Sequence, residues 1–388
     1  MPRLPDKPVV LPQPVARQIW LRAQGLADAA PFGSGPEATP RAIAHLGYVQ
    51  IDTIHVIERC HHHILYSRIP DYRRDHLRQA QSVNKSVFEY WTHALSYVPT
   101  ADLPFFIGEM KRHRLAPSNG FDTVSKQELS KVLARIRRDG ALSIRDIADD
   151  ELVEKTHAWA SKKPSKRALQ LAFYNGAVTI SARAGMLKTY ELIDRHFGWE
   201  KAPRAATDKQ VLDYRLDRAL RAQGVVSLDS ICHLDAKRKP MIRAVIEARV
   251  RRGLLVPAAI AGGEQVAHWV RPEVAEAALT AAPTQPSVHI LSPFDPLIIQ
   301  RKRLQHFFGY EHRFEAYVPK EKRVYGYFSL PVLVDDEVVA ALDLKTDRAQ
   351  RKLLVQQWTW VGKGDASRHQ ARIEEALHRF ERFQLDGH

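Results

Sequence analysis

The chain has 388 residues and a formal net charge of +14 at pH 7, a length that predicts two to four domains rather than one small core. The excess of Lys and Arg is spread along the chain, and no long uncharged apolar run or basic amphipathic anchor is present, so nucleic acid is favoured over a membrane as the partner. Only Cys60 and Cys232 occur, and the proline-rich residues 1–14 lack the apolar core of a signal peptide; we therefore expect a protein of the reducing cytoplasm, associated with the nucleoid.

In chain order, the first predicted elements are two helices, a tight turn and a further helix. Apolar residues at helical spacing predict a helix from Val15 to Leu26. Thr39-Pro40 has the pattern of an N-cap followed by proline in the first turn, and predicts a helix from Arg41 to Leu46 that Gly47 stops. Helical spacing resumes after the turn and predicts another helix that begins near Thr53.

The turn between these helices carries two polar side chains. Val49 and Ile51 alternate with Gln50 and Asp52, so an extended segment presents the amide and the carboxylate on one face. In one interpretation, Asp52 is simply the N-cap of the next helix and Gln50 is a solvated turn residue. In the other, the helix N-terminus keeps Asp52 ionised and Gln50 positions a water molecule, which suits attack on a carbon that develops positive charge.

Helix caps and turn residues predict three modules before the end of the chain. Strand formers run from Val87 to Val98, and a turn-rich stretch near residues 117–120 closes a first module at residues 1–118. The second module, residues 119–203, has three predicted helices and then a hairpin: a helix at 125–138 opened by a Ser125–Glu128 capping box, one from 142, one at 165–174, and the hairpin at 176–190. The third, residues 204–286, repeats that order with helices at 208–223, from 227 and at 239–252, and a hairpin at 254–270. Three helices followed by a hairpin are typical of a winged helix.

The last module, residues 287–388, follows a Pro- and Ala-rich linker and differs from the others. A hairpin with the acidic turn Asp335-Asp336, a strand from Leu353 to Trp360 and a closing amphipathic helix from Arg368 to Phe383 are predicted. A small antiparallel barrel or a curled sheet fits this order. The expected fold class is therefore α+β, with tandem winged-helix (helix-turn-helix) modules followed by a small β-barrel-like domain.

Four stretches resemble one family in the family's own order. They are Tyr48–Val56 continued by Arg59–His63 and Ser67-Arg68, then Phe88–Ala94, Leu291–Leu297, and Tyr317–Pro319 with Lys322–Tyr327. Together they are similar to the bacterial winged-helix DNA glycosylases of the AlkZ/YcaQ type, which unhook interstrand crosslinks and remove N7-alkylated purines. One branch of that family carries Gln-x-Gln at the first motif. The Gln50-x-Asp52 of this chain resembles the branch with broader crosslink specificity.

The resemblance implies a monomer that acts on double-stranded DNA with alkylated or crosslinked bases, without a cofactor. It implies Gln50 and Asp52 as the catalytic residues. Contacts to DNA, or support of the catalytic pair, are expected from Arg59, His61, His62, Arg68, His93, Lys322 and Arg323. Arg59 and Arg68 are equally compatible with ordinary surface or ion-pair arginines. Since an N7-alkylated guanine departs as a cation, no general acid is needed, and a carboxylate in place of a lysine amine predicts a monofunctional enzyme that leaves an abasic site.

Two alternatives remain open on the sequence alone. A non-catalytic winged-helix regulator fits the composition equally well, and would lose only a capping contribution of about 0.5–2 kcal/mol with the Asp52 carboxylate. The run Cys60-His61-His62-His63 could indicate a metal nuclease. Successive helical residues point about 100° apart, so at most two of them could share one ion, and a partly buried, partly DNA-facing run is the favoured interpretation.

Overall fold

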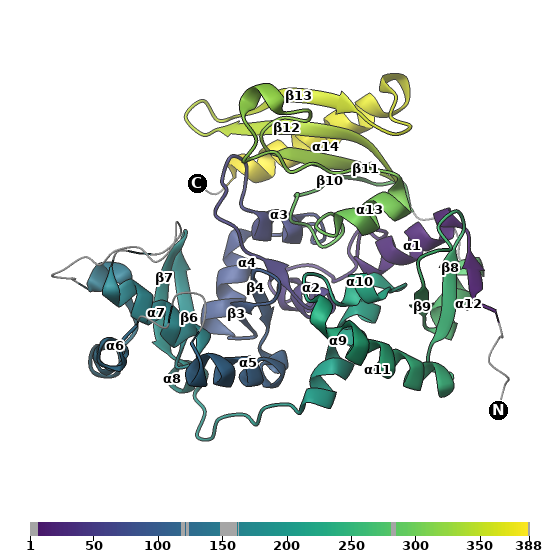
Figure 1. Cartoon of the computed structure of the whole chain (residues 1–388). Coiled ribbons are helices and arrows are strands. Elements are labelled where there is room, and N and C mark those ends of the chain that lie inside the picture. The colour runs from purple at the N-terminus through teal and green to yellow at the C-terminus, as the bar shows by residue number, and fades with distance from the viewer. Residues whose placement is uncertain are drawn as a thin grey trace. The chain divides into compact units, whose positions relative to one another are not determined.

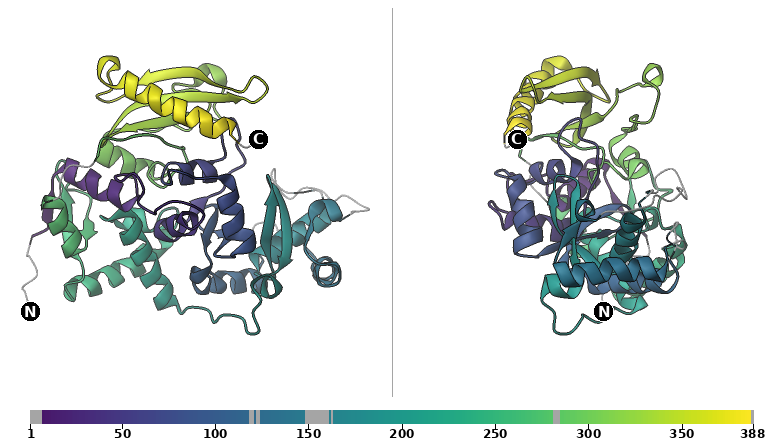
Figure 2. Two further views of the ribbon diagram at one scale, coloured as in Figure 1. Left: turned by 180° about the vertical axis from the view of Figure 1, so that it is seen from behind. Right: turned by 90° about the vertical axis from the view of Figure 1, so that its left-hand side faces the viewer.

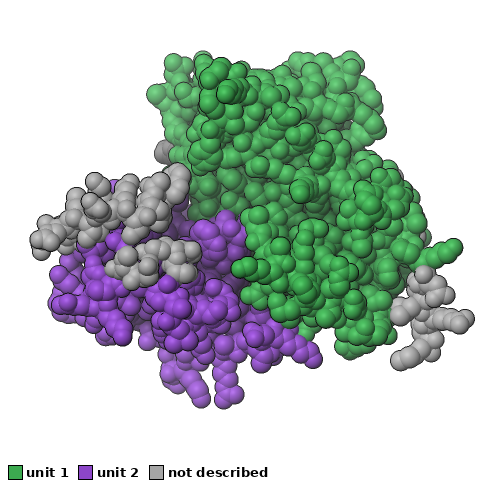
Figure 3. All heavy atoms as spheres, viewed as in Figure 1, with its two compact units in different colours: residues 1–72, 212–388 green, residues 73–211 purple. Residues whose placement is uncertain are grey.

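The computed structural model describes residues 7–117, 121, 124–147, 161, 163–280 and 285–386. The chain forms two compact units, one of residues 1–72 and 212–388 and the other of residues 73–211 (Figure 3). The first unit is therefore assembled from both ends of the sequence. Among the described residues, no helix has the length and apolar character needed to cross a membrane.

The N-terminal part of the first unit carries the predicted polar turn. Its elements are β1 (Val9–Leu11), α1 (Gln13–Ala23), α2 (Ala38–Leu46), β2 (Val49–Gln50) and α3 (Cys60–Tyr66) (Figure 1). α1 packs its apolar face into a core that includes Trp20 and Phe307, whose rings meet edge to face with centroids 4.9 Å apart. The predicted N-cap Thr39 is wrong, because Thr39 is buried inside α2 and that helix begins at Ala38.

A second group of elements in this unit comes from the middle of the chain. It comprises α9 (Asp208–Gln223), α10 (Leu228–Ile231), η4 (Ala236–Arg238), α11 (Lys239–Arg251), β8 (Val256–Ile260), β9 (His268–Val270) and α12 (Pro272–Thr280). The helices close around a core that includes Leu216, Ile242 and Ile246. β8 pairs antiparallel with β9 and parallel with β1, so the N-terminal strand completes this sheet. The predicted helices and hairpin of residues 208–270 are confirmed, and their winged-helix arrangement stays a prediction.

The C-terminal part of the first unit contains a four-stranded antiparallel sheet and several helices. It comprises β10 (Val288–Ile290), α13 (Arg301–Phe308), η5 (Lys320–Lys322), β11 (Ser329–Val334), β12 (Glu337–Asp347), β13 (Lys352–Trp360) and α14 (Ala366–Leu385). The strand order is β10-β11-β12-β13, and α14 lies across one face of the sheet (left view of Figure 2). The acidic turn at Asp335-Asp336 is confirmed. β10 and β13 stay at opposite edges, so these described strands form an open sheet; of the barrel or curled sheet expected, the barrel is wrong.

The second unit consists of helices, a hairpin and a three-stranded sheet. Its helical elements are α4 (Arg74–Arg78), the π-helical turn η1 (Gln79–Val83), η2 (Thr100–Asp102), α5 (Pro104–Leu115), α6 (Lys126–Asp139), η3 (Ile144–Asp146), α7 (Pro164–Tyr174) and α8 (Ile193–Phe197). Its strands are the hairpin β3 (Val87–Trp91) and β4 (Leu95–Pro99), and β5 (Leu142–Ser143), β6 (Val178–Ala184) and β7 (Leu187–Leu192).

Local sequence signals predict some elements of this unit and not others. The capping box that opens α6 is present, because Ser125 Oγ accepts from the Glu128 N–H and Glu128 accepts from the Ser125 N–H. The start of the helix predicted from Leu142 is wrong, because Leu142-Ser143 pairs with β7 and a 3-10 turn follows; residues 148–160, where that helix would continue, lie outside the described residues. The four expected modules do not coincide with the two units, since the first module is divided at Tyr72, and that finer division stays a prediction.

Candidate active site

The polar turn begins where Gly47 ends α2. Gly47 has a left-handed backbone with φ of +79°, and its N–H caps the Ile43 carbonyl. The side chain of Arg218 occupies the place where a Cβ would stand, so no other residue fits without displacing it. The predicted stop at Gly47 is confirmed, and the chain turns there directly into the extended pair Val49-Gln50.

Residues 49–52 do not alternate between buried and exposed, and the helix predicted to begin near Thr53 does not form there. Val49 and Ile51 are buried, and Asp52 is half-buried. Gln50 is only 6% exposed, so the interpretation of Gln50 as a solvated turn residue is wrong. Asp52 is not a helix N-cap either, because α3 begins eight residues later, at Cys60. Instead, Asp52 Oδ1 accepts the N–H of Ile54 at 2.8 Å, a turn closed by the side chain itself.

Cys60 holds this segment through a hydrogen bond to its backbone. Its Sγ donates to the carbonyl oxygen of Gln50 at 3.1 Å, which joins the first residue of α3 to the end of β2. Burial, and then the nearby Asp52 carboxylate, raise the pKa of the Cys60 thiol well above its usual value. The thiol is therefore neutral at pH 7 and remains a hydrogen-bond donor. The expectation that Cys60 belongs to the core is confirmed.

The irregular segment from Ile51 to Arg59 is held at its far end by the C-terminal part of the same unit. The Thr346 N–H, from β12, donates to the carbonyl of Val56 at 2.9 Å. The N–H of Glu58 donates to Gln384 Oε1, on α14, at 2.7 Å. These bonds give the segment a fixed path without a helix of its own. The carboxylate of Asp52 therefore sits on a backbone that is tied at both ends.

The histidines that follow are mostly interior residues. His61 and His63 are 3% and 0% exposed, so they belong to the buried part of this run, and a role of His61 in DNA binding or in support of the catalytic pair stays a prediction. His63 Nε2 hydrogen-bonds the carbonyl of Ile290 at 2.7 Å, and burial lowers its pKa to about 4. His62 is half-buried with Nδ1 2.6 Å from the Tyr72 hydroxyl. Among the described residues, no group of three or more His, Cys, Asp or Glu side chains is placed to hold a metal ion.

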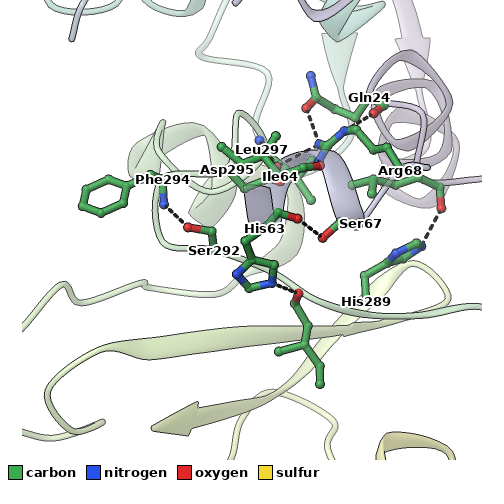
Figure 4. A network of polar contacts seen from close by, with 12 residues as sticks. Gln24, His63, Ile64, Ser67, Arg68, His289, Ser292, Phe294, Asp295 and Leu297 are labelled. Carbon is green, nitrogen blue, oxygen red and sulfur yellow. Dashed lines mark hydrogen bonds and ion pairs between the residues drawn. The ribbon is translucent and has the colours of Figure 1, made fainter. Parts of the chain in front are cut away.

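Arg68 is an interior ion-pair arginine rather than a phosphate contact. It is 2% exposed, and its two terminal nitrogens bind both oxygens of the fully buried Asp295 at 2.7 and 2.9 Å. Its Nε donates to the carbonyl of Gln24, and Nη1 also reaches the carbonyl of Ile64 (Figure 4). The guanidinium thus fastens α3 to the segment before α13. Of the two roles left open for Arg68 by the sequence, the structure shows the ion pair.

The comparisons with known proteins agree with this arrangement. The family model for AlkZ-like DNA glycosylases matches residues 43–383. The chain belongs to the AlkZ-like DNA glycosylase family. The match begins four residues before Gly47 and ends within α14, so it covers the polar turn, β12 and most of α14.

A solved structure shows the same fold. The Streptomyces sahachiroi DNA glycosylase AlkZ superposes with a TM-score of 0.62 at 16% sequence identity, and the alignment covers 96% of each chain. The mixed α+β fold class is thereby confirmed. Membership of a glycosylase family also confirms the prediction of an enzyme over that of a non-catalytic regulator.

The remaining predicted contacts of this AlkZ-like glycosylase differ in how available they are. Arg59 is half-buried, and its Nε has no hydrogen-bond partner within the described parts of the chain. Lys322 is exposed, and Arg323 is half-buried with its Nε on the carbonyl of Val318 at 2.8 Å. His93 lies in the turn of the β3–β4 hairpin of the second unit, half-buried beside Thr92. Contacts of these four residues with DNA stay predictions.

The residues that hold the turn could not be predicted from the sequence. Glu58, Thr346 and Gln384 lie far apart in sequence, and no local pattern marks them as neighbours. Asp295 could have been singled out from the sequence, because it lies in the family-like stretch Leu291–Leu297. Nothing in that stretch indicates Arg68 as its partner.

Proposed function

We propose that this glycosylase hydrolyses the N-glycosidic bond of N7-alkylated purines in duplex DNA, including purines tethered in interstrand crosslinks, as a step of base excision repair. The observation that carries the proposal is the fixed pair on one short segment: the half-buried Asp52 carboxylate, oriented by the Ile54 N–H, and Gln50 two residues before it. The enzyme would act as a monomer without a cofactor.

The chemistry follows from the charge of the leaving group. Alkylation at N7 makes the purine cationic, so the C1′–N9 bond can break with its electron pair passing to the base and without a proton donor. The sugar becomes oxocarbenium-like, and the Asp52 carboxylate stabilises that positive charge. Asp52 then accepts a proton from the water that attacks C1′, while Gln50 orients that water or the deoxyribose. The products are a free base and an abasic site.

A carboxylate on a tied segment also fits a base that cannot leave the helix. A purine linked to both strands cannot be swung out into a deep pocket in the ordinary way. The half-buried Asp52 carboxylate could reach C1′ while the base stays near the duplex. The proposed substrates therefore include purines in interstrand crosslinks.

The test is base release from a duplex with one N7-methylguanine and from a nitrogen-mustard crosslink, followed by alkaline cleavage. Asn can still accept the Ile54 N–H, so Asp52→Asn keeps the turn and removes the charge. We expect it to lower the rate at least ~100-fold, and Gln50→Ala to lower it by about 10-fold or more. Strand cleavage should require alkali, because no amine forms a Schiff base.

A matched control separates chemistry from folding. Asp365 caps α14 by accepting the Arg368 N–H, so Asp365→Asn alters another carboxylate of the same unit that only stabilises structure. It should release bases at the wild-type rate. Full activity of Asp52→Asn would refute the catalytic assignment, and release of N7-methylguanine without release from the crosslink would restrict the substrate to single adducts.

A further inference from the structure

The segment between α13 and β11, residues 309–328, is a long loop whose base is held by several hydrogen bonds. Glu315 is only 5% exposed, and its carboxylate accepts the N–H groups of Val324 at 2.9 Å and Tyr325 at 2.7 Å. Asp343, on β12, accepts the N–H groups of Tyr327 at 2.7 Å and Phe328 at 3.1 Å. Two buried carboxylates therefore fix the returning half of this loop by charge-assisted hydrogen bonds.

Gly326 allows the close approach at this base. Its φ is +101°, and the carboxylate of Asp343 occupies the place where a Cβ would stand. Gln357, on β13, adds a hydrogen bond from Nε2 to the carbonyl of Val324 at 2.8 Å. The loop is thus built onto the edge of the C-terminal sheet rather than hanging free.

The outer half of the loop is closed upon itself. The N–H of Val318 donates to the Glu315 carbonyl at 3.0 Å, and Arg323 Nε donates to the Val318 carbonyl at 2.8 Å. The guanidinium of Arg323 also lies over the ring of Tyr327, 5.0 Å from its centroid. The 3-10 turn η5 (Lys320–Lys322) forms the tip between these bonds.

This firm loop exposes apolar side chains that contribute little to the core. Tyr317 is 77% exposed, with the edge of Phe314 as its ring neighbour at a centroid distance of 6.0 Å. Val324 and Tyr327 are 46% and 36% exposed. The same stretch, residues 317–327, has three basic residues and one acidic residue. Exposed aromatic groups on a rigid, basic loop are typical of a binding surface, because little conformational entropy is lost on association.

We infer that residues 317–327 form a DNA-reading surface in which Tyr317 stacks on a base exposed at a distorted step of the damaged duplex, while Lys320, Lys322 and Arg323 face the phosphates. The inference rests on the proposed action on damaged duplex DNA. An aromatic ring stacks on any base, so it suits recognition of distortion rather than of sequence. Exposure of 77% leaves the Tyr317 ring available for such a contact.

The experiment measures binding, not base release. The probe is a duplex with a tetrahydrofuran abasic analogue opposite 2-aminopurine, compared with the fully paired duplex of the same sequence. This probe has no damaged base to release, so the outcome is independent of the Asp52 chemistry. Tyr317→Ala should weaken binding to the distorted duplex about 5-fold to 100-fold and change binding to the paired duplex by less than about twofold. Tyr317→Phe keeps the ring and should bind like the wild type.

The fluorescence of 2-aminopurine reports stacking directly. It should change when the wild type or Tyr317→Phe binds, and stay unchanged with Tyr317→Ala. Leu234→Ala is the matched control, because it removes a side chain that is 79% exposed elsewhere in the same unit. Wild-type binding and fluorescence response of Tyr317→Ala would overturn the inference and point to a protein partner for this surface. Equal losses on both duplexes would also overturn it, since they would mean a backbone contact.

Discussion

Gln384, near the C-terminal end of α14, accepts a hydrogen bond of 2.7 Å from the backbone N–H of Glu58, 326 positions earlier in the chain. The same Gln384 oxygen accepts the Thr346 hydroxyl at 3.1 Å. Since Glu58 belongs to the irregular segment that carries Asp52, the end of the chain determines the path of the proposed catalytic segment. A segment with no helix of its own depends on such distant partners.

Removal of this anchor should reduce base release more than DNA binding. Gln384→Ala leaves the buried Glu58 N–H without its acceptor, which costs about 1–3 kcal/mol of stability. We expect base release from the N7-methylguanine duplex to fall several-fold, with DNA affinity within about twofold of the wild type. Gln370→Ala is the control, because Gln370 is exposed on the same helix and its side chain donates to Glu374. Unchanged release by Gln384→Ala would show that the anchor is dispensable.

The ion pair of Arg68 and Asp295 should be among the costliest to break. Both side chains are fully buried, so Asp295→Ala leaves an uncompensated guanidinium in the interior. We expect a loss of roughly 3–5 kcal/mol in the free energy of unfolding, measured by denaturant titration. The double variant Arg68→Met, Asp295→Leu should recover part of that loss, because it removes both charges. A loss below about 1 kcal/mol for Asp295→Ala would contradict the buried pair.

A half-exposed pair provides the comparison. Asp235 pairs with Arg215 at 2.7 Å, and their side chains are 33% and 24% exposed. Asp235→Ala should cost only about 1 kcal/mol or less, because solvent screens the charges. Asp235 also pairs with Arg238 at 3.0 Å, so the contrast compares a buried bidentate ion pair with a partly exposed carboxylate shared by two arginines.

The sequence predicts local structure better than it predicts tertiary contacts. Gly47, the Ser125–Glu128 capping box and the turn at Asp335-Asp336 are each determined by neighbouring residues, and all three are as predicted. The helix expected near Thr53 does not form, although the apolar residues after it recur at helical spacing. Ile57 is buried along an irregular segment that distant elements hold in place. Tertiary contacts overrode the local pattern.

The same distinction applies to the candidate site. Gln50 and Asp52 could be named because they share one short motif, whereas the roles of Arg68 and His63 depend on burial. His63 lies on α3 and Arg68 lies two residues after its end, and nothing in this local sequence distinguishes an outward from an inward side chain without knowledge of β10 and the Asp295 segment. A basic side chain in a DNA-binding protein is easily assigned to phosphate when its buried partner is more than 200 positions away.

Lys322 should contribute to DNA binding through charge alone. It is exposed at the tip η5 of the loop between α13 and β11. Lys322→Gln should weaken binding to damaged and undamaged duplexes equally and reduce the slope of log K against log salt by about 1. Lys363→Gln is the matched control, because Lys363 is 77% exposed but paired with Glu337 at 2.7 Å. A salt slope equal to that of the wild type would exclude a phosphate contact by Lys322.

Acid should destabilise the first unit through its buried histidines. Burial lowers the pKa of both His63 and His289 to about 4 in the folded chain, below the ordinary value of 6.5. Between these values the unfolded chain binds more protons than the folded one, so stability is complete above pH 6.5 and is lost as the pH falls toward 4. At pH 5, His63 alone should cost about 2 kcal/mol relative to pH 7.

A variant that cannot take up the proton tests this dependence. His63→Gln can still donate to the Ile290 carbonyl, so it should lower stability at pH 7 but show a shallower decline between pH 6.5 and 4, by up to one proton in the slope of unfolding free energy against pH. His378→Gln, which removes an exposed histidine of α14, should keep the wild-type slope. Denaturant titrations at half-unit pH intervals measure both slopes. If the unfolding free energy of His63→Gln falls with pH as steeply as that of the wild type, burial of neutral His63 is not a cause of the acid sensitivity.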